Sequence, residues 1–178
     1  KNSEEILEII YKKASTLSKS TVILPSTSSL IIEKMDLYGS EFIYDGYKYR
    51  INLVGEHQIY NAITAIETIN TITIKSKYKN LNKKKFTISN KNITNGLSQS
   101  FIPARMEKIK SSPNIYIDGA HNLDGILKLK ETLKFITGNK ACIFGVLSNK
   151  NYKDMLEILS KEFSHIIFVN IENHSSVD

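Results

Sequence analysis

The stretch IYIDGAHN, residues 115–122, decides how this chain is expected to fold, because an apolar run ends there in a polar cluster. Its first half predicts a buried strand, and after Asn122 the apolar residues recur at helical spacing, so Asn122 is the expected N-cap. In open α/β sheets, ligands collect where strands end and helix N-termini begin. Asp118 and His121 are therefore expected at a binding edge, unless Asp118 only opens a turn and His121 only helps to cap the helix.

The residues after this stretch repeat its pattern. An apolar run at 141–147, a helical stripe at 152–163 and a second apolar run at 165–169 follow. Such alternation predicts an α/β fold with a parallel sheet and right-handed crossovers. Three strands are few for a complete domain, so we expect this unit to be truncated. The single cysteine, Cys142, lies in the first run and is expected to be a buried, inert thiol.

The first third of the chain predicts a helix and then strands. Asn2 is expected to cap an amphipathic helix, and short apolar runs at 21–24 and 30–34 suggest strands. The clearest local signal is Asp45-Gly46 between two alternating segments, which predicts a tight β-hairpin.

The next stretch, GEHQIYNA at residues 55–62, begins a helix with isoleucine every third or fourth residue. Gln58 and Asn61 are expected together on the face away from these isoleucines, near the small Ala62 and Ala65. An amide pair there could bind the edge of a base. The alternative is a polar face in solvent, with the alanines packed on a neighbouring element.

A lysine- and asparagine-rich segment at 75–95 is expected to be mostly loop, with a short helix around 92–97. A second hairpin is expected to lead into the strand at 114–117. We expect a hinge between residues 97 and 105, which divides the chain into domains at 1–99 and 100–178. Arg105 follows a rigid proline at this joint, where it could form a surface ion pair or bind a phosphate through its planar fork.

Composition limits the possible classes of protein. The 178 residues are 41% hydrophobic and 24% charged, which is ordinary for a globular protein. No apolar run approaches the ~20 residues that span a bilayer, and no signal sequence is evident, so we expect a cytoplasmic protein with no membrane partner. The net charge of +6 is concentrated at residues 75–85 rather than interleaved with aromatic residues, which argues against nucleic acid as a partner.

Three motifs in order, GEHQIYNA at 55–62, PARME at 103–107 and DGAHN at 118–122, resemble folylpolyglutamate synthases, some of which are also dihydrofolate synthases. This family belongs to the Mur ligase superfamily. The resemblance implies the end of a central ATPase domain, made of helices and a β-hairpin, followed by a Rossmann-like parallel α/β domain. It also implies a ligase in which ATP phosphorylates a substrate carboxylate and the amine of L-glutamate attacks the acyl phosphate.

By this resemblance, Asn61 would hydrogen-bond the adenine of ATP, with Gln58 as a second ATP-binding residue. Arg105 would contact the phosphates and Asp118 the ribose hydroxyls. His121 would lie near the reacting groups, as the catalytic residue. The partners implied are ATP, L-glutamate and folate or dihydropteroate, with a monomeric enzyme and no nucleic acid.

The sequence also departs from the family. Ile102, Leu123, Asn149 and Asn151 stand where the family has tryptophan, proline and two aspartates. No Gly-x-x-x-x-Gly-Lys-Ser/Thr loop occurs in the chain, and the family's Mg²⁺ ligands and modified lysine would lie before residue 1, so no metal ligand is expected here. We therefore expect part of a ligase, cut at both ends and inactive alone. Two alternatives stay open: another Mur-type amino-acid ligase of cell-wall synthesis, or a basic nucleic-acid-binding module.

Overall fold

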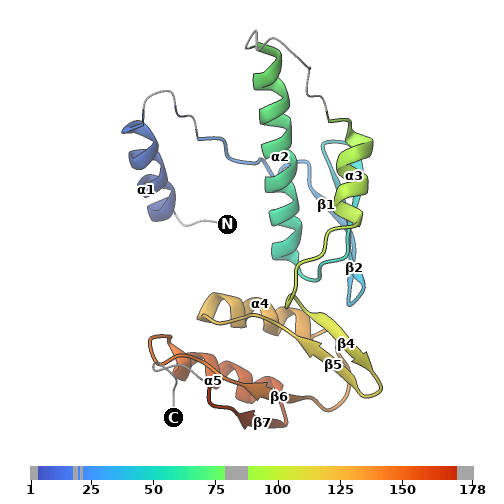
Figure 1. Cartoon of the computed structure of the whole chain (residues 1–178), viewed down its shortest axis with the longest axis vertical. Coiled ribbons are helices and arrows are strands. Elements are labelled where there is room, and N and C mark those ends of the chain that lie inside the picture. The colour runs from blue at the N-terminus through green and yellow to red at the C-terminus, as the bar shows by residue number, and fades with distance from the viewer. Residues whose placement is uncertain (1–3, 18–19, 21, 79–87, 172–178) are drawn as a thin grey trace.

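The computed structural model describes residues 4–17, 20, 22–78 and 88–171, which form a mixed α/β structure with two parts (Figure 1). The elements are, in chain order, α1 (Glu4–Ser15), β1 (Ile31–Asp36), β2 (Gly39–Tyr44), β3 (Tyr47–Ile51), α2 (Glu56–Tyr78), α3 (Asn90–Ser98), β4 (Glu107–Ser111), β5 (Asn114–Ile117), α4 (Leu123–Leu133), β6 (Ala141–Phe144), α5 (Tyr152–Glu162) and β7 (His165–Phe168). We call β1–β3 with α2 and α3 the amino-terminal part, and β4–β7 with α4 and α5 the carboxyl-terminal part.

The predicted hairpin around Asp45-Gly46 is confirmed. Strands β2 and β3 pair antiparallel from Tyr44 opposite Tyr47 to Ser40 opposite Ile51, and β1 adds a third strand on the other side of β2. Asp45 and Gly46 have φ angles of 48° and 75°. A two-residue turn needs left-handed backbone at both positions, which Asp-Gly provides at low energetic cost.

Helix α2 packs on this sheet through the predicted isoleucine stripe, and α3 closes the core beside it. The side chains of Ile59, Ile63 and Ile66 are at most 2% exposed. Their cluster of buried residues comprises Phe42, Tyr44, Tyr49, Ile51, Leu53, Ile59, Ala62, Ile63, Ile66 and Ile93. The short helix predicted at 92–97 is confirmed as α3, whereas α2 continues through residues 75–78, where a loop was predicted. Residues 79–87 of that predicted loop lie outside the described residues.

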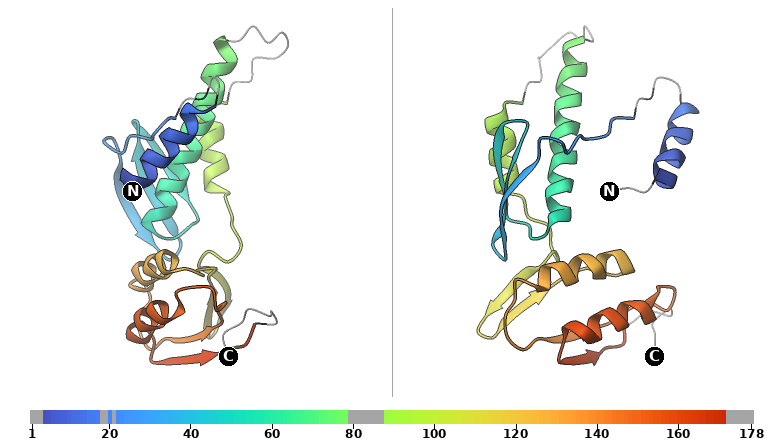
Figure 2. Two further views of the ribbon diagram at one scale, coloured as in Figure 1. Left: turned by 90° about the vertical axis from the view of Figure 1, so that its left-hand side faces the viewer. Right: turned by 180° about the vertical axis from the view of Figure 1, so that it is seen from behind.

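Helix α1 confirms the first predicted helix, but its apolar stripe is not buried. Ile6, Ile9 and Ile10 are 47%, 62% and 38% exposed, and α1 stands apart from the sheets in two views (Figures 1 and 2). The spacing of apolar residues therefore predicts a helix without saying what covers it. Asn2, the predicted cap, lies outside the described residues.

The prediction of a strand at 21–24 is wrong for residues 22–24, which have no regular structure. A strand needs a neighbour for its backbone hydrogen bonds, and Pro25 directly after this run has no N–H to donate. The other short run is confirmed as β1.

The carboxyl-terminal part differs from the predicted single parallel sheet. Strand β5 pairs antiparallel with β4, as the predicted second hairpin requires, while β6 and β7 pair parallel in a separate two-stranded sheet. The prediction of β5 as a buried strand is also wrong, because Ile115 and Ile117 are 39% and 44% exposed. The short turn between β4 and β5 lowers the entropic cost of pairing these two strands. The exposure of β5 and its separation from β6 depend instead on which distant surfaces meet.

A second cluster of buried residues holds α4, α5 and β6 together, and it comprises Ile126, Phe144, Val146, Met155 and Leu159. Cys142 is half-buried beside this cluster, and burial raises the pKa of its thiol, which agrees with an inert cysteine. Strands β6 and β7 lie on the side of α5 away from α4 (Figure 1), and Ile143 and Ile167 remain 71% and 56% exposed.

The two clusters share no residue. The division of the chain at residues 99 and 100 stays a prediction that these separate cores support. Within the part of the chain that the structure describes, no helix combines the length and the apolar character needed to cross a bilayer.

Candidate functional site

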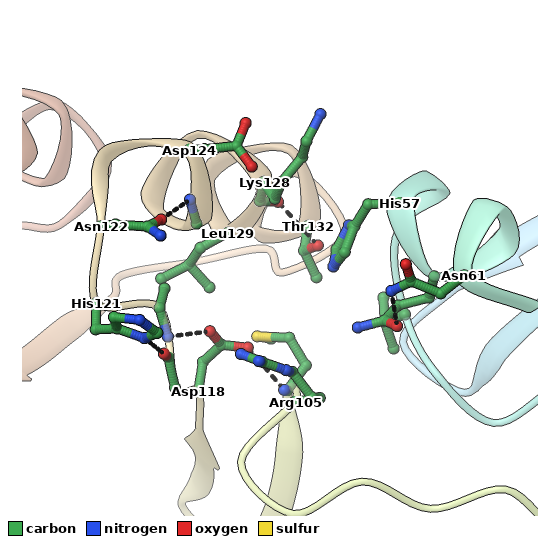
Figure 3. A pocket seen from close by; sticks show the side chains of 16 residues that line it. His57, Asn61, Arg105, Asp118, His121, Asn122, Asp124, Lys128, Leu129 and Thr132 are labelled. Atoms are coloured by element: carbon green, nitrogen blue, oxygen red, sulfur yellow. Dashed lines mark hydrogen bonds between the residues drawn. The ribbon is translucent and has the colours of Figure 1, made fainter. Parts of the chain in front are cut away.

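A cavity of about 300 Å³ lies between the first turns of α2, the turn at Arg105 and one face of α4 along most of its length. Its wall contains all the residues that the sequence singled out, namely Gln58, Asn61, Arg105, Asp118 and His121. Figure 3 shows His57 and Asn61 on the side of α2, and Arg105, Asp118 and His121 across from them beneath α4. The fold thus gathers into one cavity residues that are separated by as many as 63 positions in the sequence.

On the α2 side, the two predicted amides contact each other. Nδ2 of Asn61 donates a hydrogen bond to Oε1 of Gln58 at 3.0 Å. Gln58 is only 3% exposed, whereas Asn61 is exposed. Gln58 and the buried Ala62 are four residues apart and so share a face of α2, whereas Ala65 is exposed. A buried amide therefore supports the exposed one.

Gly55 allows the two parts of the chain to approach closely at this cavity. It has a φ of 105°, and a Cβ there would lie 2.7 Å from Cε1 of His57 and 3.2 Å from Oγ1 of Thr132 on α4. Any other residue would be strained at this φ, and its Cβ would force the His57 ring to move and crowd the side chain of Thr132.

Arg105 lies in a tight turn between Ala104 and Met106, whose φ angles of 54° and 48° are left-handed. The backbone N–H of Gly119 donates to the carbonyl of Ala104 at 2.7 Å, which ties this turn to the end of β5. Among the described residues, Arg105 forms no ion pair within 4.0 Å, so the surface ion pair considered above is not present there. The side chain of Arg105 contributes to the cavity wall instead.

Asp118 supports the same turn from the end of β5. Its Oδ2 accepts the backbone N–H of Met106 at 2.9 Å, and its Oδ1 accepts that of Ala120 at 2.9 Å. The turn role considered above is therefore real. Because each carboxylate oxygen has two acceptor sites, Asp118 can still accept hydrogen bonds from a ligand.

His121 is exposed at the rim of the cavity. Its Nδ1 lies 2.8 Å from the carbonyl oxygen of Gly119, which can only accept, so Nδ1 carries the proton and Nε2 is the free acceptor of the neutral ring. The next residue confirms its predicted role: the side chain of Asn122 caps α4 by accepting the backbone N–H of Gly125 at 2.7 Å.

His57 belongs to the motif GEHQIYNA, but the sequence predicted no function for it. It lies half-buried in the cavity wall. Its pKa is lowered first by burial, which disfavours the charged ring, and then by the positive charges of Lys128 and Arg105. Asp118 and Asp124 act in the opposite direction and do not cancel these effects. The ring is therefore neutral near pH 7.

Residues on α4 that the sequence analysis missed complete the wall. Asp124, Lys128 and Thr132 follow one another at intervals of four, so they lie along one face of the helix toward the cavity (Figure 3). Thr132 is 1% exposed and donates to the carbonyl of Lys128 at 3.2 Å. The spacing of these three polar residues could have indicated the cavity-facing side of α4. It is a weak indication, because a lysine on a helix most often faces only solvent.

The arrangement combines a guanidinium and a lysine with amides and a carboxylate. Such a wall suits a ligand that carries negative charge, a planar polar edge and hydroxyl groups. Within residues 4–17, 20, 22–78 and 88–171, no three His, Cys, Asp or Glu side chains gather as a metal site would require.

The sequence of this chain was compared with protein families and with known proteins. Residues 104–178 match the family model described as Mur ligase, glutamate ligase domain. The chain is 30% identical over 169 residues to the folylpolyglutamate synthase of Lacticaseibacillus casei, which covers 92% of this chain and 38% of that protein. It is 32% identical over 128 residues to the dihydrofolate synthase/folylpolyglutamate synthase of Bacillus subtilis (strain 168), which covers 69% of this chain and 27% of that protein.

The fold is shared as well. The solved FPGS-AMPPCP-folate complex superposes with a TM-score of 0.75 at 28% identity, over 93% of this chain and 40% of that one. The chain thus spans well under half the length of the relatives it matches. Residues 104–178 of this chain therefore form a Mur ligase, glutamate ligase domain, and the chain is similar to folylpolyglutamate synthases over nine tenths of its length.

Proposed function

We propose that this chain forms part of an ATP-dependent ligase that adds L-glutamate to folates through an acyl phosphate. The observation that carries the proposal is the cavity between the two parts, where Gln58, Asn61, Arg105, Asp118 and His121 meet. The similarity to folylpolyglutamate synthases, including a structure with AMPPCP and folate, supports the choice of substrates.

In the proposed complex, the nucleotide lies across the cavity. The amide of Asn61, oriented by Gln58, binds the edge of the adenine, because an amide offers a donor and an acceptor side by side. Arg105 binds phosphate oxygens through its fork, and the free acceptor sites of Asp118 receive the ribose hydroxyls. Lys128 adds positive charge along α4, which favours a polyanionic ligand.

The reaction that follows has two steps. A carboxylate oxygen of the folate attacks the γ-phosphorus of ATP, and ADP leaves. The amine of L-glutamate then attacks the acyl carbon, phosphate leaves with the bonding electrons, and the amine loses a proton as the amide forms. Nε2 of His121, whose ring is oriented by Gly119, is the proposed acceptor for that proton or a hydrogen-bonding group beside it.

The chain by itself is proposed to bind nucleotide weakly and to perform no ligation. Phosphoryl transfer depends on positioning and on neutralising charge around the transferred group. The sequence has no Gly-x-x-x-x-Gly-Lys-Ser/Thr loop to cradle the phosphates. We also propose a cytoplasmic location for this activity.

The first test is a titration of the purified 178-residue chain with AMPPCP, followed by NMR. Amide signals around Asn61, Arg105 and Asp118 should shift at millimolar nucleotide, and the Asn61→Ala variant should weaken binding. Glu131→Ala, on the exposed face of α4 beside Lys134, is the matched control and should bind as the parent chain does. Absence of any shift at these residues would show that the cavity is not a nucleotide site.

The second test is an assay with MgATP, L-glutamate and a reduced folate. The chain should give no glutamylated product, whereas a longer protein that includes it should. Turnover by the chain alone that disappears in Asp118→Ala would contradict the proposal of an inactive part. Glutamylation of a muramyl substrate instead of folate by the longer protein would favour the cell-wall ligase.

A further inference from the structure

The turn that presents Arg105 to the cavity has an unfavourable backbone. Ala104 and Met106, on either side of Arg105, have φ angles of 54° and 48°. Residues with a Cβ rarely adopt this left-handed region, and they remain there only when their surroundings fix them. The direction in which Arg105 leaves the backbone therefore depends on what holds its two neighbours.

Two carboxylates hold them. Oε2 of Glu107 accepts the backbone N–H of Ala104 at 2.9 Å, and Oδ2 of Asp118 accepts that of Met106 at 2.9 Å. Hydrogen bonds to a charged acceptor are roughly twice as strong as neutral ones. Each left-handed residue is thus held by its own carboxylate.

The β4–β5 hairpin fixes the places of both carboxylates. Glu107 is the first residue of β4 and pairs with Ile117, the last residue of β5, and Asp118 follows Ile117 directly. Among the residues that the structure describes, Glu107 forms no ion pair that would draw it from the turn. Glu107 as a whole residue is only partly exposed.

We propose that Glu107 is a positioning residue for Arg105: it holds Ala104 in the left-handed conformation and so aims the guanidinium at the anionic part of the ligand. This inference rests on the proposed function only for the identity of that ligand, a nucleotide. Glu107 itself is not among the residues that line the cavity, so its proposed role needs no contact with the ligand. Its effect passes through the backbone of the turn.

The first experiment needs no nucleotide. Hydrogen exchange of the Ala104 amide is measured by NMR in the full 178-residue chain and in variants at Glu107. Glu107→Ala removes the acceptor and should speed exchange at Ala104 by about tenfold or more. Glu107→Gln keeps an acceptor oxygen and should retain most of the protection. Glu107→Asp keeps the charge but is one methylene shorter, so it should behave like the alanine variant.

The second experiment measures AMPPCP affinity in the same variants. Glu107→Ala and Glu107→Asp should weaken binding by about tenfold, and Glu107→Gln should bind nearly as the parent chain does. Glu131→Ala, which removes an exposed glutamate on α4, is the control for net charge. A role in charge alone would make Glu107→Gln as weak as Glu107→Ala, and that result would overturn the proposal.

A glycine at position 104 tests the mechanism directly. Glycine adopts left-handed backbone freely, so the turn should depend less on Glu107 in the Ala104→Gly background. The loss of affinity caused by Glu107→Ala should therefore be smaller there than in the parent chain. An equal loss in both backgrounds would contradict the proposal, as would unchanged exchange at Ala104 in Glu107→Ala.

Failure of this inference is distinguishable from failure of the proposed function. If the parent chain binds no AMPPCP, the nucleotide proposal fails, while exchange at Ala104 still decides whether Glu107 holds the turn. If the parent chain binds and all Glu107 variants bind equally, the nucleotide proposal stands and Glu107 is not a positioning residue.

Discussion

Nδ2 of Asn61 donates to Oε1 of Gln58 at 3.0 Å, so a buried amide sets the orientation of an exposed one at the cavity wall. This bond leaves Oδ1 of Asn61 and its second N–H for a ligand. The adenine edge presents N6 as a donor and a ring nitrogen as an acceptor, which matches an amide held in this way.

Replacing Gln58 with leucine should therefore reduce selectivity for adenine. Without its partner the Asn61 amide can rotate. ITP has an acceptor at the position of the adenine amino group, so the parent chain should bind ATP more tightly than ITP. In Gln58→Leu the ratio of the two affinities should fall by about tenfold. Competition binding with the two nucleotides measures this ratio. Asn70→Leu, which alters an amide on the same helix that contacts Glu67, is the control. An unchanged ratio in Gln58→Leu would show that Asn61 is not oriented by its neighbour.

Asp118→Ala separates two roles of one carboxylate. It removes the acceptor of Met106 in the turn and the proposed acceptor of the ribose, so affinity for ATP should fall by about tenfold or more. The ribose role is isolated by 2′,3′-dideoxy-ATP: the parent chain should prefer ATP, and Asp118→Ala should bind the two equally weakly. If the preference for ATP persists in the variant, Asp118 serves only the turn.

Stability should depend on pH through His57. Burial, Lys128 and Arg105 lower its pKa in the folded chain. Asp118 and Asp124 raise the pKa but do not cancel this effect, so the unfolded chain binds the proton more readily. The free energy of unfolding is then highest above the ordinary histidine pKa of about 6.5 and falls as pH drops toward the lowered value. Urea denaturation at several pH values between about 7 and 5 should show this fall.

The matched comparison uses two histidine variants. His57→Gln should flatten the fall in stability, whereas His165→Gln, at an exposed position on β7, should leave it as in the parent chain. Equal slopes in the parent chain and His57→Gln would show that another group causes the pH dependence.

The two core clusters predict two separate responses to cavity formation. Ile66→Ala in the amino-terminal part and Met155→Ala in the carboxyl-terminal part each remove a side chain that is at most 2% exposed, at a cost of about 2–5 kcal/mol. Hydrogen exchange should accelerate mainly in the part that carries the substitution, because the clusters share no residue. Acceleration of equal size in both parts would show a single core and contradict the proposed division near residue 99.

Local chemistry explains which elements could be predicted from the sequence. The hairpin at Asp45-Gly46 follows from two adjacent residues that tolerate left-handed backbone, and the cap of α4 follows from Asn122 alone. The exposure of β5 and its absence from the β6–β7 sheet could not be predicted, because they depend on which distant surfaces meet. Apolar content at 114–117 indicates a strand but not its neighbours.

The same distinction applies to the site. Asp118 and His121 could be placed from a strand end and a helix start, but their meeting with Asn61 depends on how the two parts of the chain pack. The helical spacing places Gln58 away from the isoleucine stripe, but its burial to 3% exposure depends on what packs there in the folded chain. Lys128 could not be distinguished from an ordinary surface lysine.

The cavity has one wall on α2 and the other on α4 and the turn at Arg105, and each wall belongs to a different core. A ligand that touches both walls binds only those molecules in which the two cores face each other in this arrangement. Its apparent dissociation constant is the intrinsic constant divided by the fraction of such molecules. A substitution far from the cavity that alters this fraction would change the affinity without touching any residue of the wall. The weak binding proposed for the chain would then reflect the population of this arrangement as well as the contacts in the cavity.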